Sequence, residues 1–401
     1  MTIPADLIPI ESPQHDAEDR DAVRVPGGVV EYEVFPASFA QERLWLVQRL
    51  DGGSHAYHLF RAFRVHGRLD GAALERAFAG LVRRHESLRT TFREEDGHPV
   101  QVIAPFAGFA LAVEEVSGED VRRRLAEESA RAFDLRAGPL FRAGVLRAGD
   151  EEHVLWMAMH HIASDGWSME ILYRELAALY ATAVRGDEAP LPELPLQYAD
   201  WAVWQRERLQ GDALERELAW WRERLAGAPA LLELPADHPR PPMQTYRGAQ
   251  ERFELAPGLA ERLEALARGE GATLYMVLLA AFQVLLAKYA GTDDVVAGSP
   301  VAGRTHRDVE PLVGFFANLL VLRTDLSGDP SFREVLRRVR AVALGALDHQ
   351  EVPFEKLVAE LQPERTLSHA PLVQSVFALE GAGRAAGDWP GVRLEPVEIE
   401  L

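Results

Sequence analysis

The sequence predicts an α/β protein built from two lobes. Strand-like and helix-like apolar spacings alternate along the chain, before and again after a proline-rich, acidic stretch at 186–195. The chain has 401 residues, of which 47% are hydrophobic, enough to bury the cores of two or three domains. We therefore expect a flexible tail at 1–30, an N-terminal lobe at 31–185 and a C-terminal lobe at 186–401, each with a layered sheet.

In the N-terminal lobe, polar residues mark where the helices begin. Ser38, followed three residues later by Gln41, is the pattern of a capping box, and Asp70 precedes a second apolar stripe of helical period. A tight turn is expected at Asp96-Gly97 between two short strands. The remaining elements expected here are strands at 62–66, 141–146 and 153–159 and helices at 119–133 and after residue 166.

The C-terminal lobe shows the same mixture of elements. A long charged helix should begin near Gln197, Thr273 should cap an apolar helix, and Pro330 should occupy the first position of another. Strands are expected at 252–255, at 294–298 and within 313–323. The run 274–287 is shorter than the ~20 residues that a membrane span needs, so a core helix is the expectation.

Composition and charge exclude several classes of function. The net charge of −19 opposes binding to phosphate backbones and to anionic membranes. The absence of cysteine excludes disulfides, thiol nucleophiles and thiolate metal sites. No secretory signal is visible at the N-terminus. We expect a cytoplasmic protein that binds no metal, nucleic acid or membrane.

The segment 160–166, His-His-Ile-Ala-Ser-Asp-Gly, is the main candidate for chemistry. It follows an apolar strand, on which neighbouring side chains point to opposite faces, so His160 and His161 should face different surroundings. Ser164 or Asp165 can cap the next helix. From the residues alone, two interpretations stay open: a strand end with two packed histidines, or a reactive imidazole held by a turn.

Seven segments in order give the chain a resemblance to the condensation domains of nonribosomal peptide synthetases. The segments lie between residues 38 and 377, and they are SFAQERLWLVQRL, RHESLRTTF, MHHIASDGWSMEIL, YADWAVW, VGFFANLLVLR, HQEVPFEKLV and HAPLVQSVF. The resemblance implies a V-shaped pseudo-dimer of two chloramphenicol-acetyltransferase-like lobes with a tunnel between them. Because the chain ends at Leu401, before the last strand and helix of the family, the C-terminal lobe is expected to be truncated.

The resemblance also implies a function and its partners. Donor and acceptor peptidyl carrier proteins would present substrates on phosphopantetheine arms, and an acceptor amine would attack the donor thioester to form an amide. No intrinsically bound cofactor is implied. We expect a monomer, with an adenylation domain as a further partner downstream.

Site residues follow from the same motifs. His161 matches the catalytic histidine, with His160, Asp165 and Gly166 as the supporting motif. The arginine that holds the aspartate is expected to be Arg304. Tunnel-lining positions are expected at Trp167, Ser168 and Asn318.

The motifs favour a domain that accepts an L-configured or achiral donor, or a starter domain, the latter if Met1 is a native start. Two other functions stay open: a stand-alone acyltransferase that uses acyl-CoA, and a non-catalytic domain that only recruits carriers or other enzymes.

Overall fold

The computed structural model describes residues 20–25, 28–51, 55–187, 191–245, 247–363, 366, 368–380 and 389–398. Its contacts divide the chain into two units, which are treated separately below. Unit 1 comprises 1–208, 304–316 and 382–401, and unit 2 comprises 209–303 and 317–381. The boundary therefore falls after residue 208, not at the predicted 186, and two later segments return to unit 1.

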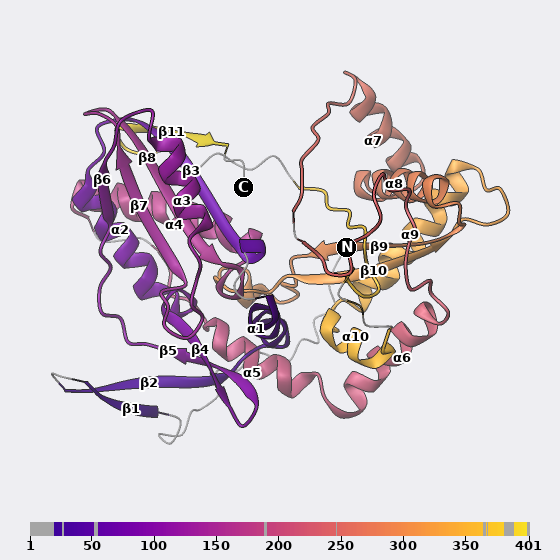
Figure 1. Cartoon of the computed structure of the whole chain (residues 1–401), viewed down its shortest axis with the longest axis horizontal. Helices are drawn as coiled ribbons and strands as arrows, with labels where there is room; N and C mark the ends of the chain where they lie inside the picture. The colour runs from indigo at the N-terminus through magenta and orange to yellow at the C-terminus, as the bar shows by residue number, and fades with distance from the viewer. Residues whose placement is uncertain are drawn as a thin grey trace. The chain divides into compact units, whose positions relative to one another are not determined.

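The main sheet of unit 1 has the strand order β11-β3-β8-β7-β6 (Figure 1). Its strands are β3 (His58–Gly67), β6 (Ala112–Glu115), β7 (Phe141–Arg147), β8 (Glu152–His160) and β11 (Val392–Val397). Only the β6–β7 pair is parallel. Strand β8 lies in the middle of this sheet, and its last residue, His160, pairs with His58.

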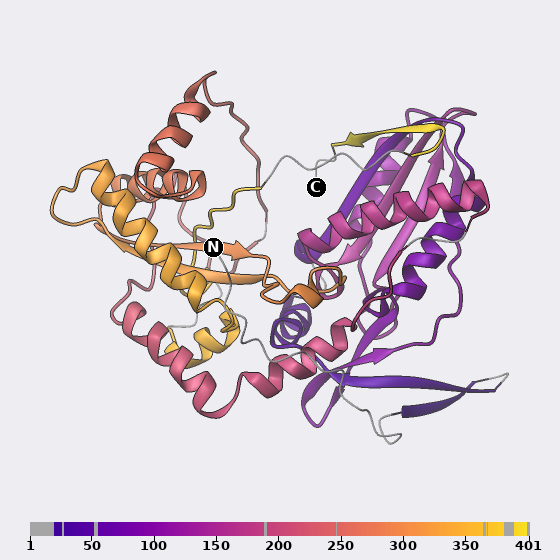
Figure 2. The same cartoon turned by 180° about the vertical axis from the view of Figure 1, so that it is seen from behind.

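Alternating side chains of β8 build two cores, one on each face of the sheet. Met157 and Met159 pack with α2 (Gly71–Arg84) and α4 (Gly166–Arg185), and these helices lie on the face toward the viewer in Figure 2. Trp156 and Ala158 pack instead with α1 (Phe39–Asp51) and α3 (Val121–Ala130). The predicted period-two strand is thereby confirmed, and the end of β8 is anchored from both sides.

A second sheet in unit 1 has the order β1-β2-β5-β4. Its strands are β1 (Arg20–Val25), β2 (Gly28–Pro36), β4 (Thr90–Glu95) and β5 (His98–Ile103). The predicted tail at 1–30 is wrong in its second half, because β1 pairs with β2 along its whole length. Residues 1–19 lie outside the described residues. The predicted turn at Asp96-Gly97 is confirmed, with both residues at positive φ.

The predicted boundary at residue 186 is wrong because helix α5 (Tyr198–Arg208) belongs to unit 1. Ala199 and Val203 pack on Phe35 and Ile103 of the second sheet, so the helix belongs to unit 1 although it follows the proline-rich stretch. Composition marked that stretch as a linker, but long-range packing, which composition does not encode, decides the boundary.

Short 3₁₀ turns in unit 1 lie at His55–Tyr57, Glu86–Arg89, His161–Ala163 and Arg307–Val309.

The described part of unit 2 contains an antiparallel pair, β9 (Asp294–Val301) and β10 (Asn318–Asp325), and several helices. The helices are α6 (Gly211–Leu225), α7 (Leu259–Gly269), α8 (Leu274–Ala290), α9 (Phe332–Asp348) and α10 (Phe354–Leu361). Thr273 caps α8 as predicted. The predicted strand at 252–255 is absent, and Phe253 there is 82% exposed. Helix α9 starts at Phe332 behind a Ser331 cap, so Pro330 is not its first residue.

Within the described part of the chain, no helix is by itself long and apolar enough to cross a bilayer. Only α7 and α8 taken together meet that test, and their axes are bent by 102° at the break between them.

Candidate active site at the end of strand β8

The candidate site begins where β8 ends. His160 is the last strand residue and is fully buried, with its Nδ1 accepting a hydrogen bond from Ile162 N (3.0 Å). The chain then leaves the strand in a 3₁₀ turn, so His161 follows the geometry of the turn and not the alternation of the sheet. Gln41 of α1 fixes this turn by donating from Nε2 to Ile162 O (3.2 Å).

The imidazole of His161 is held in one tautomer. Its Nδ1 lies 2.8 Å from the backbone oxygen of Ser164. A carbonyl oxygen can only accept, so Nδ1 carries the proton in the neutral ring and Nε2 has a free lone pair. Burial lowers the pKa of His161 below its usual 6.5, while the carboxylate of Asp165 acts in the opposite direction. The ring is therefore neutral near pH 7.

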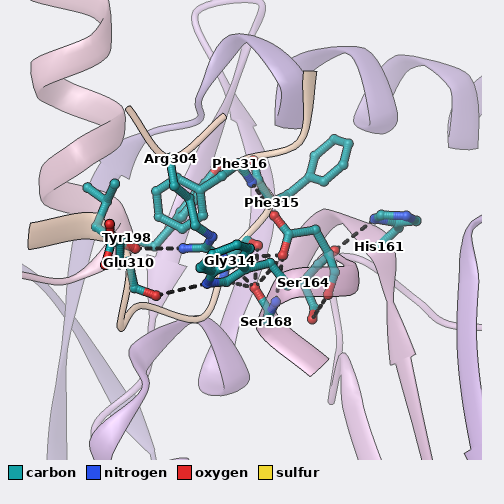
Figure 3. Close-up of polar contacts among 12 residues, drawn as sticks. His161, Ser164, Ser168, Tyr198, Arg304, Glu310, Gly314, Phe315 and Phe316 are labelled. Carbon is teal, nitrogen blue, oxygen red and sulfur yellow. Dashed lines mark hydrogen bonds and ion pairs between the residues drawn. The ribbon is translucent and has the colours of Figure 1, made fainter. Parts of the chain in front are cut away.

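The labelled side chains of Ser168, Arg304 and Phe316 lie close together in Figure 3. Asp165, the buried residue that caps α4, is hydrogen-bonded to all three residues. Its Oδ1 accepts from Ser168 N (2.8 Å), from Ser168 Oγ (2.7 Å) and from Arg304 Nη2 (3.2 Å). Its Oδ2 accepts from Phe316 N (3.0 Å). Four hydrogen bonds are thus directed at the two oxygens of this one side chain, and a bond from the charged guanidinium is among them.

Arg304 is the partner of that carboxylate. Both side chains are 2% exposed. The guanidinium also donates to Val309 O (2.6 Å) and to Ser168 Oγ (2.8 Å), and it lies 4.0 Å from the ring centre of Phe316. The arginine thus joins the start of α4 to the segment 304–316, which lies far away in sequence.

Ser168 is part of this cluster and does not line an open passage. Its side chain is fully buried, and its hydroxyl accepts from Gly314 N (3.1 Å) in addition to its bonds with Asp165 and Arg304. The prediction that Ser168 lines a tunnel is therefore wrong, because position 168 points back into the turn that Asp165 caps.

Trp167 and Asn318, the other two tunnel predictions, lie in different units. Trp167 is 47% exposed and borders a cavity of about 380 Å³ in unit 1, and its Nε1 donates to Glu310 O (3.1 Å). Asn318 starts β10 in unit 2. Its Nδ2 donates to Gln350 O and Val352 O, and its Oδ1 accepts from Phe354 N (3.0 Å). The amide of Asn318 thereby fastens the loop before α10.

Tyr198 and Phe315 also belong to the site, although sequence reasoning missed both. Tyr198 has the helical spacing of a core residue, yet its hydroxyl donates to Phe315 O (2.7 Å) and lies 2.8 Å from Ser38 Oγ. The Phe315 ring packs on His161 with a centroid distance of 4.9 Å. The sequence signal for Phe315 is the pair of Phe residues after Gly314. Such a pair predicts core packing as readily as a place beside a reactive side chain.

Gly314 is required by the close approach of Tyr198. A Cβ at position 314 would lie 1.9 Å from Tyr198 Cδ2. We expect Gly314→Ala to lower the free energy of unfolding by about 1–3 kcal/mol, because the aromatic ring and the backbone must both shift. Thermal unfolding should show this loss, whereas Gly149→Ala, where a Cβ meets nothing within 4 Å, should be nearly neutral. Equal unfolding curves for the two variants would contradict the steric argument.

No cluster of three or more His, Asp or Glu that could hold a metal ion occurs in the described ranges. The described side chains around His161 provide a neutral imidazole, hydrogen-bonded to a carbonyl and in contact with an aromatic ring, beside a buried carboxylate–guanidinium pair.

Comparison with known proteins agrees with these features. The family model described as "Condensation domain" matches residues 31–384. One of the subunits of linear gramicidin synthase from Brevibacillus parabrevis is 48% identical over 370 residues, which cover 90% of this chain and 5% of that protein. Chondramide synthase cmdD from Chondromyces crocatus is 44% identical over 376 residues, which cover 92% of this chain and 10% of that protein. The chain thus spans a tenth or less of the length of these two relatives.

Solved structures show the same fold. The X-domain from teicoplanin biosynthesis, alone and in complex with OxyB, is 33% identical, has a TM-score of 0.84 and is matched over 95% of this chain and 84% and 82% of the two solved chains. The first condensation domain of the CDA synthetase is 24% identical with a TM-score of 0.74, over 91% of this chain and 86% of that one. The chain therefore belongs to the condensation-domain family.

Proposed function

We propose that this chain forms amide bonds between two carrier-bound substrates. The donor is an acyl or peptidyl thioester, the acceptor is an aminoacyl group with a free amine, and both arrive on phosphopantetheine arms of carrier proteins. The observation that carries the proposal is the Nδ1–Ser164 hydrogen bond, which leaves the Nε2 lone pair of His161 available to an amine. No hydrogen bond from a described residue occupies that nitrogen.

The proposed reaction needs one group that accepts a proton. The amine nitrogen attacks the thioester carbon, and the tetrahedral intermediate expels the thiolate of the donor arm as the amide forms. Nε2 of His161 accepts the proton that the amine loses and can pass it to the thiolate. No acyl-enzyme intermediate is involved, because the amine attacks the thioester directly.

Alignment of the two substrates should contribute more than base strength. An α-amine has a pKa of about 8, so a useful fraction is already neutral near pH 7. General base catalysis contributes ~10²–10⁴-fold, whereas holding two reactants in line can remove ~7–11 kcal/mol of the barrier. We infer that His161 mainly orients the amine through its hydrogen bond and takes the proton as the intermediate collapses.

Gly166 supplies a second feature of the proposal. It is the first residue of α4 and is exposed, and the amide groups in the first turn of a helix lack partners within that helix. The Gly166 N–H can thus donate to the thioester oxygen, where negative charge develops.

The pH dependence of the rate should report the lowered pKa of His161. The imidazole must be neutral to accept a proton, and burial favours the neutral form, so activity should persist as pH falls to 6.5 and be lost only below it. Single-turnover rates measured with an aminooxy acceptor, whose amine stays neutral through this range, would isolate the imidazole. An acid limb at or above pH 6.5 would contradict the assignment.

Loading two carrier proteins and detecting acyl transfer by intact-mass spectrometry tests the function itself. Transfer from donor carrier to acceptor carrier is the expected result. Transfer from free acyl-CoA alone would instead identify a stand-alone acyltransferase. The choice between an L-donor and a starter domain would follow from which loaded donors, aminoacyl or fatty acyl, are consumed. Monomeric state, a cytoplasmic location and an adenylation domain as partner are further parts of the proposal.

A non-catalytic role is the second candidate, and one observation favours it. The X-domain of teicoplanin biosynthesis, which has been solved in complex with OxyB, has a TM-score of 0.84 to this chain. Carrier binding without acyl transfer in the same assay would favour a recruiting domain over the condensation reaction.

A further inference from the structure

The aromatic ring of Phe315 is the only side-chain ring in contact with the imidazole of His161 among the described residues. The ring centroids are 4.9 Å apart and the planes are inclined by 67°, an edge-to-face arrangement. The imidazole of His161 is hydrogen-bonded through Nδ1 to Ser164 O. One hydrogen bond fixes one edge of the imidazole but leaves the ring free to tilt about that bond, so a second contact is needed to fix the direction of Nε2.

The backbone on both sides of Phe315 is held in place. Tyr198 donates to the carbonyl of Phe315, and the next amide, of Phe316, donates to Asp165 Oδ2. On the other side, Gly314 N donates to Ser168 Oγ (3.1 Å), and Gly314 has no room for a Cβ against Tyr198. These bonds fix the position of the Phe315 Cα, and the partly buried ring packs against the core cluster that includes Ile162 and Ala163 of the His161 turn.

One of the groups that restrain the backbone at Phe315, the side chain of Asp165, also lies beside the turn that carries His161. Asp165 caps α4 shortly after the turn that carries His161, and the same carboxylate accepts from Phe316 N. Both aromatic side chains therefore extend from backbone that one buried carboxylate anchors. The two backbone segments that carry the rings are therefore linked through the same buried side chain.

We propose that Phe315 is a positioning residue for His161: its ring, fixed by the bonds of Tyr198 and Asp165 to the 314–316 backbone, sets the direction in which Nε2 points. This inference rests on the proposed function, in which that nitrogen orients the acceptor amine. Phe315 itself exchanges no proton with substrate. It acts through the imidazole.

The kinetic test compares Phe315→Ala, Phe315→Leu and Phe315→Tyr. A misplacement of about 1 Å in a reacting group can cost 10²-fold, so Phe315→Ala should lower kcat by about 10- to 100-fold with little change in KM. Phe315→Leu, which restores bulk without a ring edge, should recover part of this loss, and Phe315→Tyr should recover most of it. Unchanged kcat in Phe315→Ala would overturn the proposal.

A double variant separates positioning from general destabilisation. In a His161→Ala background there is no imidazole to orient, so adding Phe315→Ala should leave the residual rate unchanged. A further loss equal to that seen with His161 present would show that Phe315 acts on the fold or on substrate and would overturn the proposal.

Proton and carbon NMR of the His161 ring provide a readout that needs no turnover. Phe315→Ala should remove the ring-current shift of the His161 ring protons, and it should raise the His161 pKa toward its usual value, because the ring excludes water. Asp165 remains in place in this variant as the charged group acting on His161. If the wild-type chain fails to condense substrates while these NMR changes occur, the proposed function fails and the positioning contact stands. If Phe315→Ala changes neither the chemical shifts of the His161 ring protons nor the pKa of His161, the positioning role fails.

Discussion

Asp165→Ala is expected to lower the free energy of unfolding by about 3–5 kcal/mol, the cost of removing one partner of a buried ion pair. The substitution leaves the guanidinium of Arg304 buried without its carboxylate, and it also removes the cap of α4. Phe316 N loses its acceptor as well. Chemical denaturation with an optical probe would measure the loss.

Asp187→Ala is the matched control for that variant. Asp187 also pairs with an arginine, Arg185 at 3.0 Å, but both side chains are more than half exposed. Such a pair contributes about 0–1 kcal/mol, so the control should unfold almost as the wild type does. If Asp165→Ala were no less stable than Asp187→Ala, Asp165 could not be the structural centre of the site.

Removing the guanidinium of Arg304 should lower the free energy of unfolding by less than removing the carboxylate of Asp165. Arg304→Met keeps the aliphatic bulk against Phe316, and Asp165 retains its three other donors, two on Ser168 and one on Phe316. The difference in the free energy of unfolding between Asp165→Ala and Arg304→Met measures how much those three donors stabilise the carboxylate without the guanidinium.

Local features of the site could be predicted from the sequence because they depend on neighbours in the chain. An Asp just before a helical segment can accept a hydrogen bond from the backbone N–H three residues later, which is the pattern of a helix N-cap. Asp165 caps α4 in this way through Ser168 N. Period two places Met157 and Met159 on one face of β8, and they do pack together with α2 and α4. The pairing of Asp165 with Arg304, 139 residues apart, came from motif resemblance and not from spacing.

Long-range packing explains what the sequence could not indicate. Whether Ser168 faces an open passage or a buried guanidinium depends on where the segment 304–316 lies, and nothing near residue 168 encodes that. Tyr198 has the spacing of a core residue, and its hydroxyl acquires a role only because Phe315 O is placed beside it. Likewise, the alternation at 252–255 is typical of a strand, but a strand also needs a neighbour to pair with.

His161→Ala is expected to leave the fold intact and to lower the condensation rate by about 10²–10⁴-fold, the range for loss of a general base. The imidazole contributes one hydrogen bond to Ser164 O, which is worth about 0.5–1.5 kcal/mol, and the Asp165–Arg304 cluster does not depend on it. Stability should therefore change little while the rate falls. This combination is the reverse of that expected for Asp165→Ala, in which stability is lost first.

His306→Ala is the matched control for His161→Ala. His306 is another histidine of unit 1, and its side chain, 13% exposed, lies 3.4 Å from Asp308. Its removal should leave the single-turnover rate of acyl transfer close to that of the wild type. If His161→Ala retained the wild-type rate as well, alignment of the two substrates would have to account for the whole of catalysis, and the proton acceptor would have to be the solvent or the leaving thiolate.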